Sequence, residues 1–161
     1  MESQTYSFSY EVFDSIKNLS NEDAELLEKA RKLTKQAYAP YSHFQVAAVA
    51  RTVNGQFIEG TNQENASFPA GICAERVLLS TASSICPDEA IISMAISYHQ
   101  ENGECNHPIS PCGICRQSLQ EYEQRLDHPI RLILGGMTGK IFIIPTASYL
   151  LPLAFTKNAL G

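Results

Sequence analysis

The first clear pattern of hydrophobic and polar positions begins after Ser20. Ser20 with Asp23 three residues later has the form of a helix N-terminal box, and the apolar residues that follow recur at helical spacing. These apolar residues are Leu26, Leu27, Ala30, Leu33 and Ala37. The pattern predicts an amphipathic helix over about Asp23–Tyr38, which Pro40 stops because proline lacks the N–H that the next turn needs.

A hairpin and a second helix are predicted next. The runs Gln45–Val53 and Gln56–Gly60 flank Asn54-Gly55, a dipeptide that suits a tight turn with positive φ at both central residues. From Cys73 to about Ile85 the apolar residues cover much of a helix circumference, which is typical of a buried helix.

The rest of the chain predicts further strands and helices in alternation. The elements are a strand at Ile91–Tyr98, a polar stretch at His99–Ser110, a helix from about Cys112 to Leu126, strands at Arg131–Leu134 and Lys140–Ile144, and a short helical tail. Apolar strands that alternate with helices favour a sheet covered on both faces. We therefore expect an α/β fold, a three-layer α/β/α domain with a central mixed five-stranded sheet.

Composition adds limits on size and partners. The 161 residues suit a single domain over residues 1–161, in which residues 1–20 form an N-terminal extension of unknown role. Seventeen acidic against twelve basic residues give a net charge of −5, which disfavours a nucleic acid polymer or an anionic membrane as a partner. The apolar clusters are too short to cross a bilayer. An uncharged small molecule remains a suitable ligand.

The five cysteines bear on the cellular compartment and on metal binding. An odd number, without a secretory signal, argues against a disulfide framework and predicts a reducing, cytoplasmic location. Cys112 and Cys115 stand three apart at a predicted helix start, where both sulfurs lie on one side and the helix dipole favours thiolates. Taken alone, the pair suits half a zinc site, a redox pair or two buried apolar side chains.

Cys73, at the start of another predicted helix, is a candidate third ligand. Three cysteine ligands would leave the fourth tetrahedral position of zinc for water, as in catalytic sites. Glu75 lies about 200° around the helix from Cys73, so we expect it to act on that water rather than bind the metal. Three thiolates and Zn²⁺ sum to −1, and Arg76 would offset this charge by donating hydrogen bonds to sulfur. Alone, Glu75 also suits a helix-start carboxylate, and Arg76 a surface ion pair.

Five segments in order resemble a known family. They are Tyr41–Val46, Asn62–Ser67, Cys73-Ala74-Glu75-Arg76, Pro111–Gln117 and Leu150-Leu151-Pro152 with Phe155. Together they are similar to the zinc-dependent cytidine deaminases of the compact, three-cysteine, homotetrameric type, whose sites belong to the nucleobase deaminase class. The chain departs from the family pattern at Ala47, at Phe68 and at Thr156-Lys157.

The resemblance implies a role for each matching residue. The metal ligands would be Cys73, Cys112 and Cys115, with one Zn²⁺ per subunit, and Glu75 would be the proton shuttle. Asn62 and Glu64 would bind the sugar hydroxyls, which an amide and a carboxylate suit chemically. The substrate base would lie near Phe44 and the backbone of Ala74. Phe155 would reach the site of a neighbouring subunit in a homotetramer, while Cys86 and Cys105 receive no role.

The expected activity is hydrolysis of cytidine and deoxycytidine to uridine and deoxyuridine with release of ammonia, a reaction of pyrimidine salvage. One alternative keeps this chemistry and changes the substrate to a related aminopyrimidine nucleoside analogue, such as an antibiotic. Another is a structural zinc module closed by Cys105 as a fourth ligand. Editing of cytidine in RNA or DNA is disfavoured by the net charge.

Overall fold

A six-stranded mixed sheet forms the centre of the molecule. The computed structural model describes residues 1–160, and Gly161, the last residue of the predicted domain, lies outside them. The strands lie in the order β1-β6-β5-β4-β2-β3. They span β1 Glu11–Phe13, β2 Phe44–Thr52, β3 Phe57–Thr61, β4 Ile91–Gln100, β5 Arg131–Gly135 and β6 Ile141–Ile144. The pair β4–β5 is parallel and the other neighbours are antiparallel.

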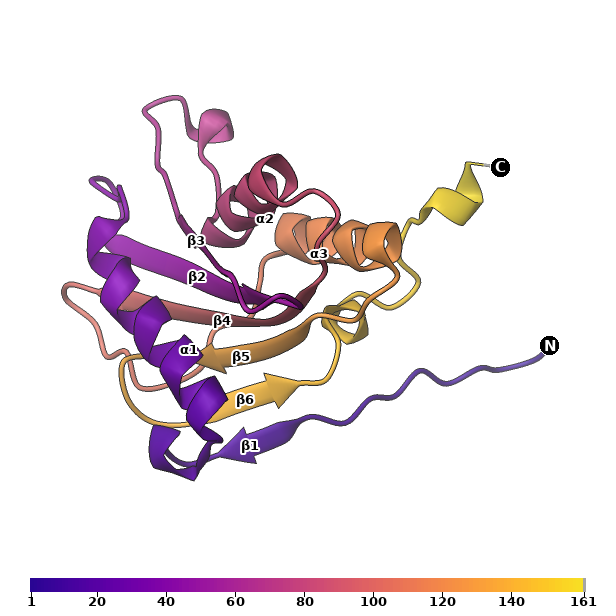
Figure 1. Cartoon of the computed structure of the whole chain (residues 1–161), viewed down its shortest axis with the longest axis horizontal. Coiled ribbons are helices and arrows are strands. Elements are labelled where there is room, and N and C mark those ends of the chain that lie inside the picture. Colours follow the sequence, from indigo (N-terminus) through magenta and orange to yellow (C-terminus); the bar gives the residue numbers. More distant parts are fainter. Residues whose placement is uncertain (161) are drawn as a thin grey trace.

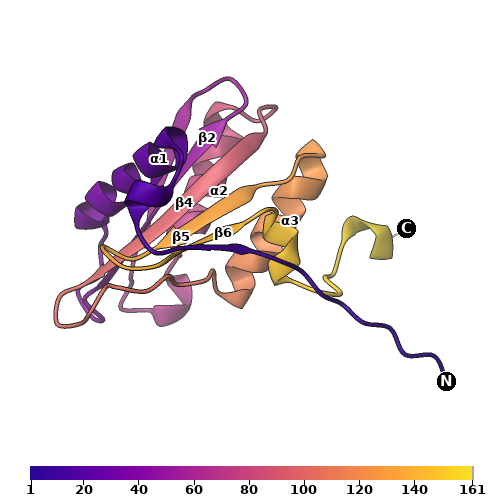
Figure 2. The same cartoon turned by 90° about the horizontal axis from the view of Figure 1, so that it is seen from below.

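Helices cover both faces of this sheet. Figures 1 and 2 show α1 (Asn21–Leu33) on one face and α2 (Ala74–Ile85) with α3 (Gly113–Leu126) on the other. Because successive strand residues point to opposite faces, each strand supplies two cores. Ala47, Val49 and Ile133 pack with α1, whereas Ala48, Met94 and Leu132 pack with α2 and α3. The expected three-layer α/β/α architecture is confirmed.

The expected count of five strands is wrong by one. The sixth strand, β1, comes from the N-terminal extension and pairs with β6, as Glu11 with Ile143 and Phe13 with Ile141. A strand of three residues carries too little alternation to be recognised locally. Before β1, aromatic residues of the extension contact β6 and the segment after it. The Tyr10 and Phe142 rings lie 5.0 Å apart, and Tyr6 Oη donates to Tyr149 O at 3.2 Å.

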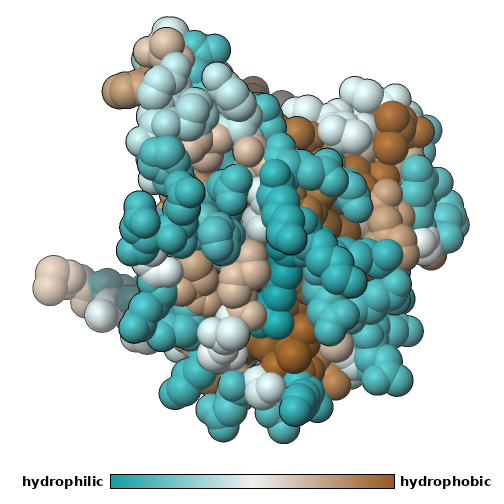
Figure 3. Space-filling model, turned by 90° about the vertical axis from the view of Figure 1, so that its left-hand side faces the viewer, coloured by the Kyte–Doolittle hydropathy of each residue, from teal (hydrophilic) through white to brown (hydrophobic). Residues whose placement is uncertain are grey.

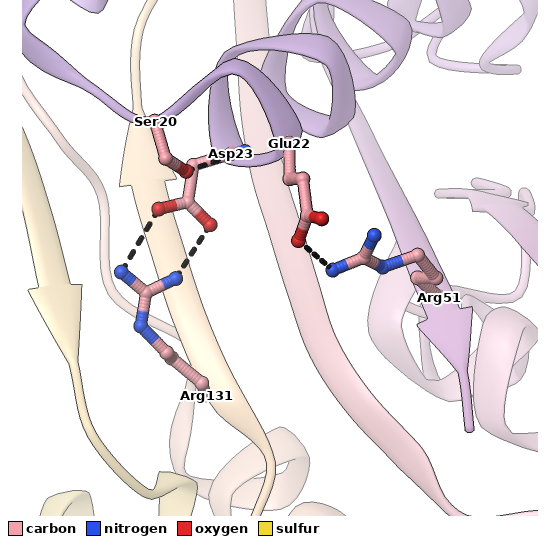
Figure 4. Close-up of polar contacts among 5 residues, drawn as sticks. All are labelled: Ser20, Glu22, Asp23, Arg51 and Arg131. Carbon is pink, nitrogen blue, oxygen red and sulfur yellow. Dashed lines mark hydrogen bonds and ion pairs between the residues drawn. The ribbon is translucent and has the colours of Figure 1, made fainter. Parts of the chain in front are cut away.

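Two ion pairs at its first turn attach α1 to the sheet (Figure 4). The Asp23 carboxylate accepts hydrogen bonds from Nη1 and Nη2 of Arg131 on β5, at 2.5 and 2.9 Å. Glu22 forms an ion pair with Arg51 on β2 at 2.5 Å. The Ser20 hydroxyl accepts the Asp23 N–H at 3.2 Å, which confirms the predicted N-terminal cap, and the helix begins at Asn21, two residues before the predicted start. The helix ends at Leu33, earlier than predicted, and tightens into a 3₁₀ turn.

Three local predictions change in detail. The hairpin is confirmed, but within it only Gly55 has positive φ, of 81°, because the loop has three residues between Thr52 and Gln56. The predicted helices at Cys73 and Cys112 begin one residue later, and each of these cysteines is the N-cap. The expected helical tail consists of short 3₁₀ turns.

Close packing of β3 on α2 fixes the position of the helix that Cys73 caps. A Cβ at Gly60 would lie 2.5 Å from Ala74 O and 2.5 Å from Leu78 N, so only glycine fits there without a shift.

The face of the molecule on the left-hand side of Figure 1 presents mainly hydrophilic residues with hydrophobic ones between them (Figure 3). Within residues 1–160, no helix is both long enough and apolar enough to cross a membrane.

Candidate active site

Three cysteine sulfurs converge where α2 and α3 begin. Cys73 caps α2, Cys112 caps α3, and Cys115 lies in the first turn of α3. The Sγ atoms of Cys73 and Cys112 are 3.7 Å apart, those of Cys112 and Cys115 are 3.6 Å apart, and all three lie within 4.8 Å of one another. Packing of both helices on the same face of the sheet brings these sulfurs together from segments far apart in the sequence.

This cluster fits zinc. Zinc bound tetrahedrally at about 2.3 Å from each sulfur separates neighbouring sulfurs by about 3.8 Å, close to the two distances observed. The three sulfurs leave one tetrahedral position for water, which is typical of catalytic rather than structural zinc sites. The cluster, found among residues 1–160, contains the three cysteines and no carboxylate.

The surroundings of the cysteines favour a thiolate. The helix starts place partial positive charge next to the sulfurs. Hydrogen bonding with Cys115 is the main cause that lowers the pKa of Cys73 to about 6, and the same contact raises the pKa of Cys115. The lowered pKa of Cys73 favours its thiolate form, and metal binding would displace the remaining protons.

Glu75 lies beside the cysteine cluster in the first turn of α2. Its side chain is only 5 % exposed, and this burial raises its pKa, because a charged carboxylate loses hydration there. Glu75 lines the same cavity as Cys73, Ala74 and Cys112. A buried carboxyl group with a raised pKa is suited to taking up a proton and returning it.

A cavity of about 420 Å³ opens over the cysteines and Glu75. Its walls include Phe44, Val46, Asn62, Glu64, Ile109 and Ser110. An adjoining cavity of about 450 Å³ shares Ser42, Asn62, Glu64 and Cys73 and reaches Tyr41 and Phe68. These volumes lie within the range of small-molecule sites, about 300–1,000 Å³. The structure thus brings five sequence-predicted residues to one cavity with the metal cluster: Phe44, Asn62, Glu64, Ala74 and Glu75.

Glu64 is held as an ionised acceptor by the segment before β2. Its Oε1 accepts the Ser42 hydroxyl at 2.5 Å, and its Oε2 accepts the backbone N–H groups of Tyr41 at 2.8 Å and Ser42 at 3.3 Å. The Ser42 hydroxyl is the main cause that lowers the pKa of Glu64, followed by the Tyr41 N–H. Sequence reasoning gave no role to Ser42, although it stands in the segment that carries the resemblance.

Asn62 braces the start of β2. Its Oδ1 accepts the Val46 N–H at 2.8 Å, and its Nδ2 donates to Phe44 O at 2.9 Å. The side-chain amide retains one further hydrogen and one lone pair for a ligand. Asn62 therefore fixes the backbone that presents Phe44 to the cavity, while the predicted contact with a sugar hydroxyl stays a prediction.

Two predicted residues lie away from this cavity. Phe155 is 62 % exposed on the C-terminal segment, outside the cavity of its own chain. Arg76 lines a different cavity, between α2 and α3, and makes no hydrogen bond to sulfur within the described residues. Its positive charge lowers the pKa of Cys73, by less than the hydrogen bonds of Cys115 and Cys112 do. The hydrogen-bonding role predicted for Arg76 stays a prediction.

Arg116 makes contacts that sequence reasoning did not anticipate. Its Nε donates to Pro111 O at 2.8 Å and its Nη1 donates to Leu150 O at 3.0 Å. These bonds hold the turn that carries Cys112 against the segment after β6. The available signal was its position directly after Cys115.

The remaining cysteines stand apart from the metal cluster. Cys105 Sγ accepts the Gln100 N–H at 3.1 Å in the loop after β4, and it is not a member of the cluster formed by described residues. Cys86 is buried at the end of α2, where burial raises its pKa. The four-cysteine structural site considered above is therefore not favoured, because Cys105 is not among the clustered sulfurs of the described residues.

Comparison with known proteins adds independent evidence. Residues 20–126 match the model of the cytidine and deoxycytidylate deaminase zinc-binding region. The chain is 36 % identical over 133 residues to a cytidine deaminase of Halalkalibacterium halodurans, covering 83 % of this chain and 93 % of that protein. It is 29 % identical over 143 residues to a blasticidin-S deaminase of Bacillus cereus, covering 88 % of this chain and 97 % of that protein.

A solved structure agrees with these matches. The crystal structure of a cytidine deaminase from Burkholderia pseudomallei superposes with a TM-score of 0.71 at 34 % identity, covering 85 % of this chain and all of that chain. The matched segments include all three cysteines and the helices that position them. The chain belongs to the cytidine and deoxycytidylate deaminase family, defined by the zinc-binding region that its residues 20–126 match.

Proposed function

We propose that the protein catalyses the zinc-dependent hydrolytic deamination of cytidine and deoxycytidine to uridine and deoxyuridine, with release of ammonia. The observation that carries this proposal is the position of buried Glu75 beside a three-cysteine cluster at the floor of one cavity. An open zinc site, a buried proton carrier and a cavity with neutral and acidic walls suit an uncharged base and sugar. The net charge of −5 also favours a free nucleoside over a nucleic acid polymer.

The protein's own residues account for proton movement and orientation. Zinc held by the three thiolates supplies Lewis-acid activation of a water molecule. Glu75 Oε would accept a proton from the attacking water and deliver it to the ring nitrogen, while the water oxygen bonds to the ring carbon that bears the amino group. Glu75 would then carry the proton of the new hydroxyl group to the amine, which leaves as ammonia when the C–N bond breaks and the carbonyl forms. Burial of Glu75 supports both directions of transfer, because its raised pKa lies closer to neutral pH.

The walls of the cavity orient the substrate. Glu64, ionised and held by Ser42, accepts hydrogen bonds from sugar hydroxyls, and Asn62 adds its free amide hydrogen. Phe44 provides an apolar ring next to the base. Ala74 also lines the cavity, and its backbone at the start of α2 contributes a further polar contact.

The test is Glu75→Gln, which keeps the shape of the side chain and removes its proton-carrying capacity. We expect kcat for cytidine to fall by at least about 100-fold, as for other positioned acid–base groups. Zinc content and the unfolding temperature should stay near the wild-type values. Glu121→Gln, an exposed carboxyl on α3 outside this cavity, is the matched control and should keep full activity. Residual activity of Glu75→Gln above a tenth of wild type would contradict the proposal.

A second substrate class calls for a parallel assay. The Bacillus cereus relative is named for blasticidin S, and it is similar over nearly the whole of this chain. Turnover of cytidine, deoxycytidine and blasticidin S by the purified protein would rank the three. A higher kcat/KM for blasticidin S than for both nucleosides would replace the proposed substrate while leaving the chemistry in place.

We further infer a single domain over residues 1–161, a homotetramer, and a role in pyrimidine salvage in the cytoplasm. The exposed ring of Phe155 supports the assembly, since it lies outside the cavity of its own chain and is available for contact with a neighbouring subunit. Five free cysteines support a reducing compartment. Sedimentation of wild type and Phe155→Ala would test the tetramer, with KM as the second readout. A monomeric mass for wild type at the concentration of the activity assay would contradict it.

A further inference from the structure

Behind the Phe44 wall of the cavity lies a second aromatic ring. Tyr98 on β4 is 1 % exposed, and its ring stacks on Phe44 with centroids 5.0 Å apart and planes tilted by 18°. In the β2–β4 register Val46 faces Tyr98, so Phe44 is its diagonal neighbour on the same side of the sheet. Tyr98 does not line the cavity itself, but it determines where the Phe44 ring can lie.

The hydroxyl of Tyr98 reaches the loop that leads to the metal cluster. Tyr98 Oη lies 3.3 and 3.4 Å from the two ring nitrogens of His107 and 3.5 Å from Glu104 O. Burial raises the pKa of Tyr98, so its hydroxyl remains a hydrogen-bond donor at physiological pH. The residues from 101 to 112, here called the 101–112 loop, continue from this contact to Ile109 and Ser110 in the cavity wall and end at Cys112.

The first half of the 101–112 loop is packed tightly on the turn between β5 and β6. Thr138 N–H donates to Cys105 O at 3.1 Å. A Cβ at Gly139, whose φ is 77°, would lie 1.9 Å from Asn106 O, so the two backbones are in direct contact. The half that follows His107 lacks such a support from this turn. The Tyr98–His107 contact therefore lies between the packed half of the loop and the half that lines the cavity.

We propose that Tyr98 is a positioning residue for substrate binding: its ring fixes Phe44 and its hydroxyl anchors the 101–112 loop, so that both walls of the cavity are set by one side chain. This inference rests on the proposed deamination of a nucleoside. It predicts an effect on KM rather than on kcat, because the hydrogen-bond partners of Tyr98 Oη among the described residues are Glu104 and His107, not Glu75 or the three clustered cysteines. It also gives the polar segment after β4 a function in closing the cavity.

The test separates the two halves of the side chain. Tyr98→Phe keeps the stacked ring and removes the hydroxyl, and His107→Ala removes the other partner from an exposed position. One net hydrogen bond corresponds to about a 2- to 10-fold change, so each variant should raise KM for cytidine by that factor with kcat within about twofold of wild type. The double variant should match Tyr98→Phe, because that single change already removes the contact between Tyr98 and His107. Tyr98→Leu, which also removes the stack, should raise KM further.

Hydrogen exchange supplies a readout that does not depend on activity. Amides of residues 101–111 should exchange faster in Tyr98→Phe and His107→Ala than in wild type, with zinc content unchanged. Tyr122→Phe, another buried tyrosine outside this cavity, is the control and should change neither KM nor loop exchange.

The inference is overturned if both variants leave loop exchange and KM at wild-type values. It is equally overturned if Tyr98→Phe lowers kcat or zinc content with KM unchanged, which would indicate a structural role alone. A wild-type protein that does not turn over cytidine contradicts the proposed function instead, and loop exchange in the variants still decides whether Tyr98 anchors the loop.

Discussion

Glu123 on α3 offers a sharp test of how the helix that carries two cysteines is held in place. Glu123 is 7 % exposed, and its carboxylate accepts four hydrogen bonds from the residue before β5 and the segment after β6. Oε1 accepts Ile130 N at 2.6 Å, Thr146 Oγ1 at 2.8 Å and Ala147 N at 2.9 Å, and Oε2 accepts Ser148 N at 3.1 Å. We therefore expect substitutions here to lower the free energy of unfolding.

The magnitude follows from the donors left without an acceptor. Glu123→Ala would leave the backbone N–H groups of Ile130 and Ser148 unpaired, at about 1–3 kcal/mol each. The Ala147 N–H keeps its bond to Ile130 O at 2.9 Å, and the Thr146 hydroxyl keeps its contact with Ser148 at 2.8 Å. A loss of about 4 kcal/mol approaches the whole stability of many domains, so we expect little of this variant to be recovered folded. Glu123→Gln can retain the Oε1 bonds and loses the one at Oε2. We expect it to cost about 2 kcal/mol.

Guanidinium denaturation at fixed protein and zinc concentrations measures this cost as a shift in midpoint with an unchanged slope. Glu121→Gln, exposed on the same helix, should stay within about 0.5 kcal/mol of wild type. If Glu123→Gln is as stable as Glu121→Gln, the four bonds do not hold α3 as described.

Three further changes probe the site and its support. Cys105→Ser should retain one zinc per chain and full activity, since Cys105 lies outside the cluster; zinc loss measured by elemental analysis would restore the four-cysteine site. Gly60→Ala should cost about 1–3 kcal/mol in thermal unfolding and lower zinc retention, because the added Cβ meets the α2 backbone; unchanged unfolding would show that β3 can yield. Because hydrogen bonding lowers the pKa of Glu64, its ionised form is present above the ordinary pKa of a glutamate and is lost only as pH falls through the lowered value. Ser42→Ala removes the main cause, so the rise of KM on acidification should begin at a higher pH, and coincident KM profiles would refute this.

The helices that carry the cysteines could be predicted closely from the sequence. Apolar spacing and the change of pattern at Cys73 and Cys112 are local signals, and the structure moves each helix start by one residue. The hairpin could be predicted for the same reason. The end of α1 could not, because Tyr38 N–H pairs with Asn62 O at 3.1 Å and draws the chain out of helical geometry. Asn62 lies directly after β3, far from the helix along the chain, so no local pattern shows this contact.

The chemistry of the site divides in the same way. The cysteines and Glu75 were recognisable by residue type and spacing, since a metal site needs particular side chains. The residues that hold these groups in position could not be recognised from the sequence. Ser42 on Glu64, Arg116 on Leu150 and Tyr98 beneath Phe44 are contacts between segments that only the folded sheet brings together. Serine, arginine and tyrosine are common residue types, so their roles depend on position rather than on identity.

The pairing of β1 with β6 has a consequence for solubility. The β6 sequence Ile141-Phe142-Ile143-Ile144 has no charge and no proline, a composition that readily adds strands from other molecules when its backbone is open. β1 occupies that open side and replaces it with a three-residue edge that carries Glu11. The N-terminal extension thus acts as a cover that keeps copies of the protein from joining sheet to sheet.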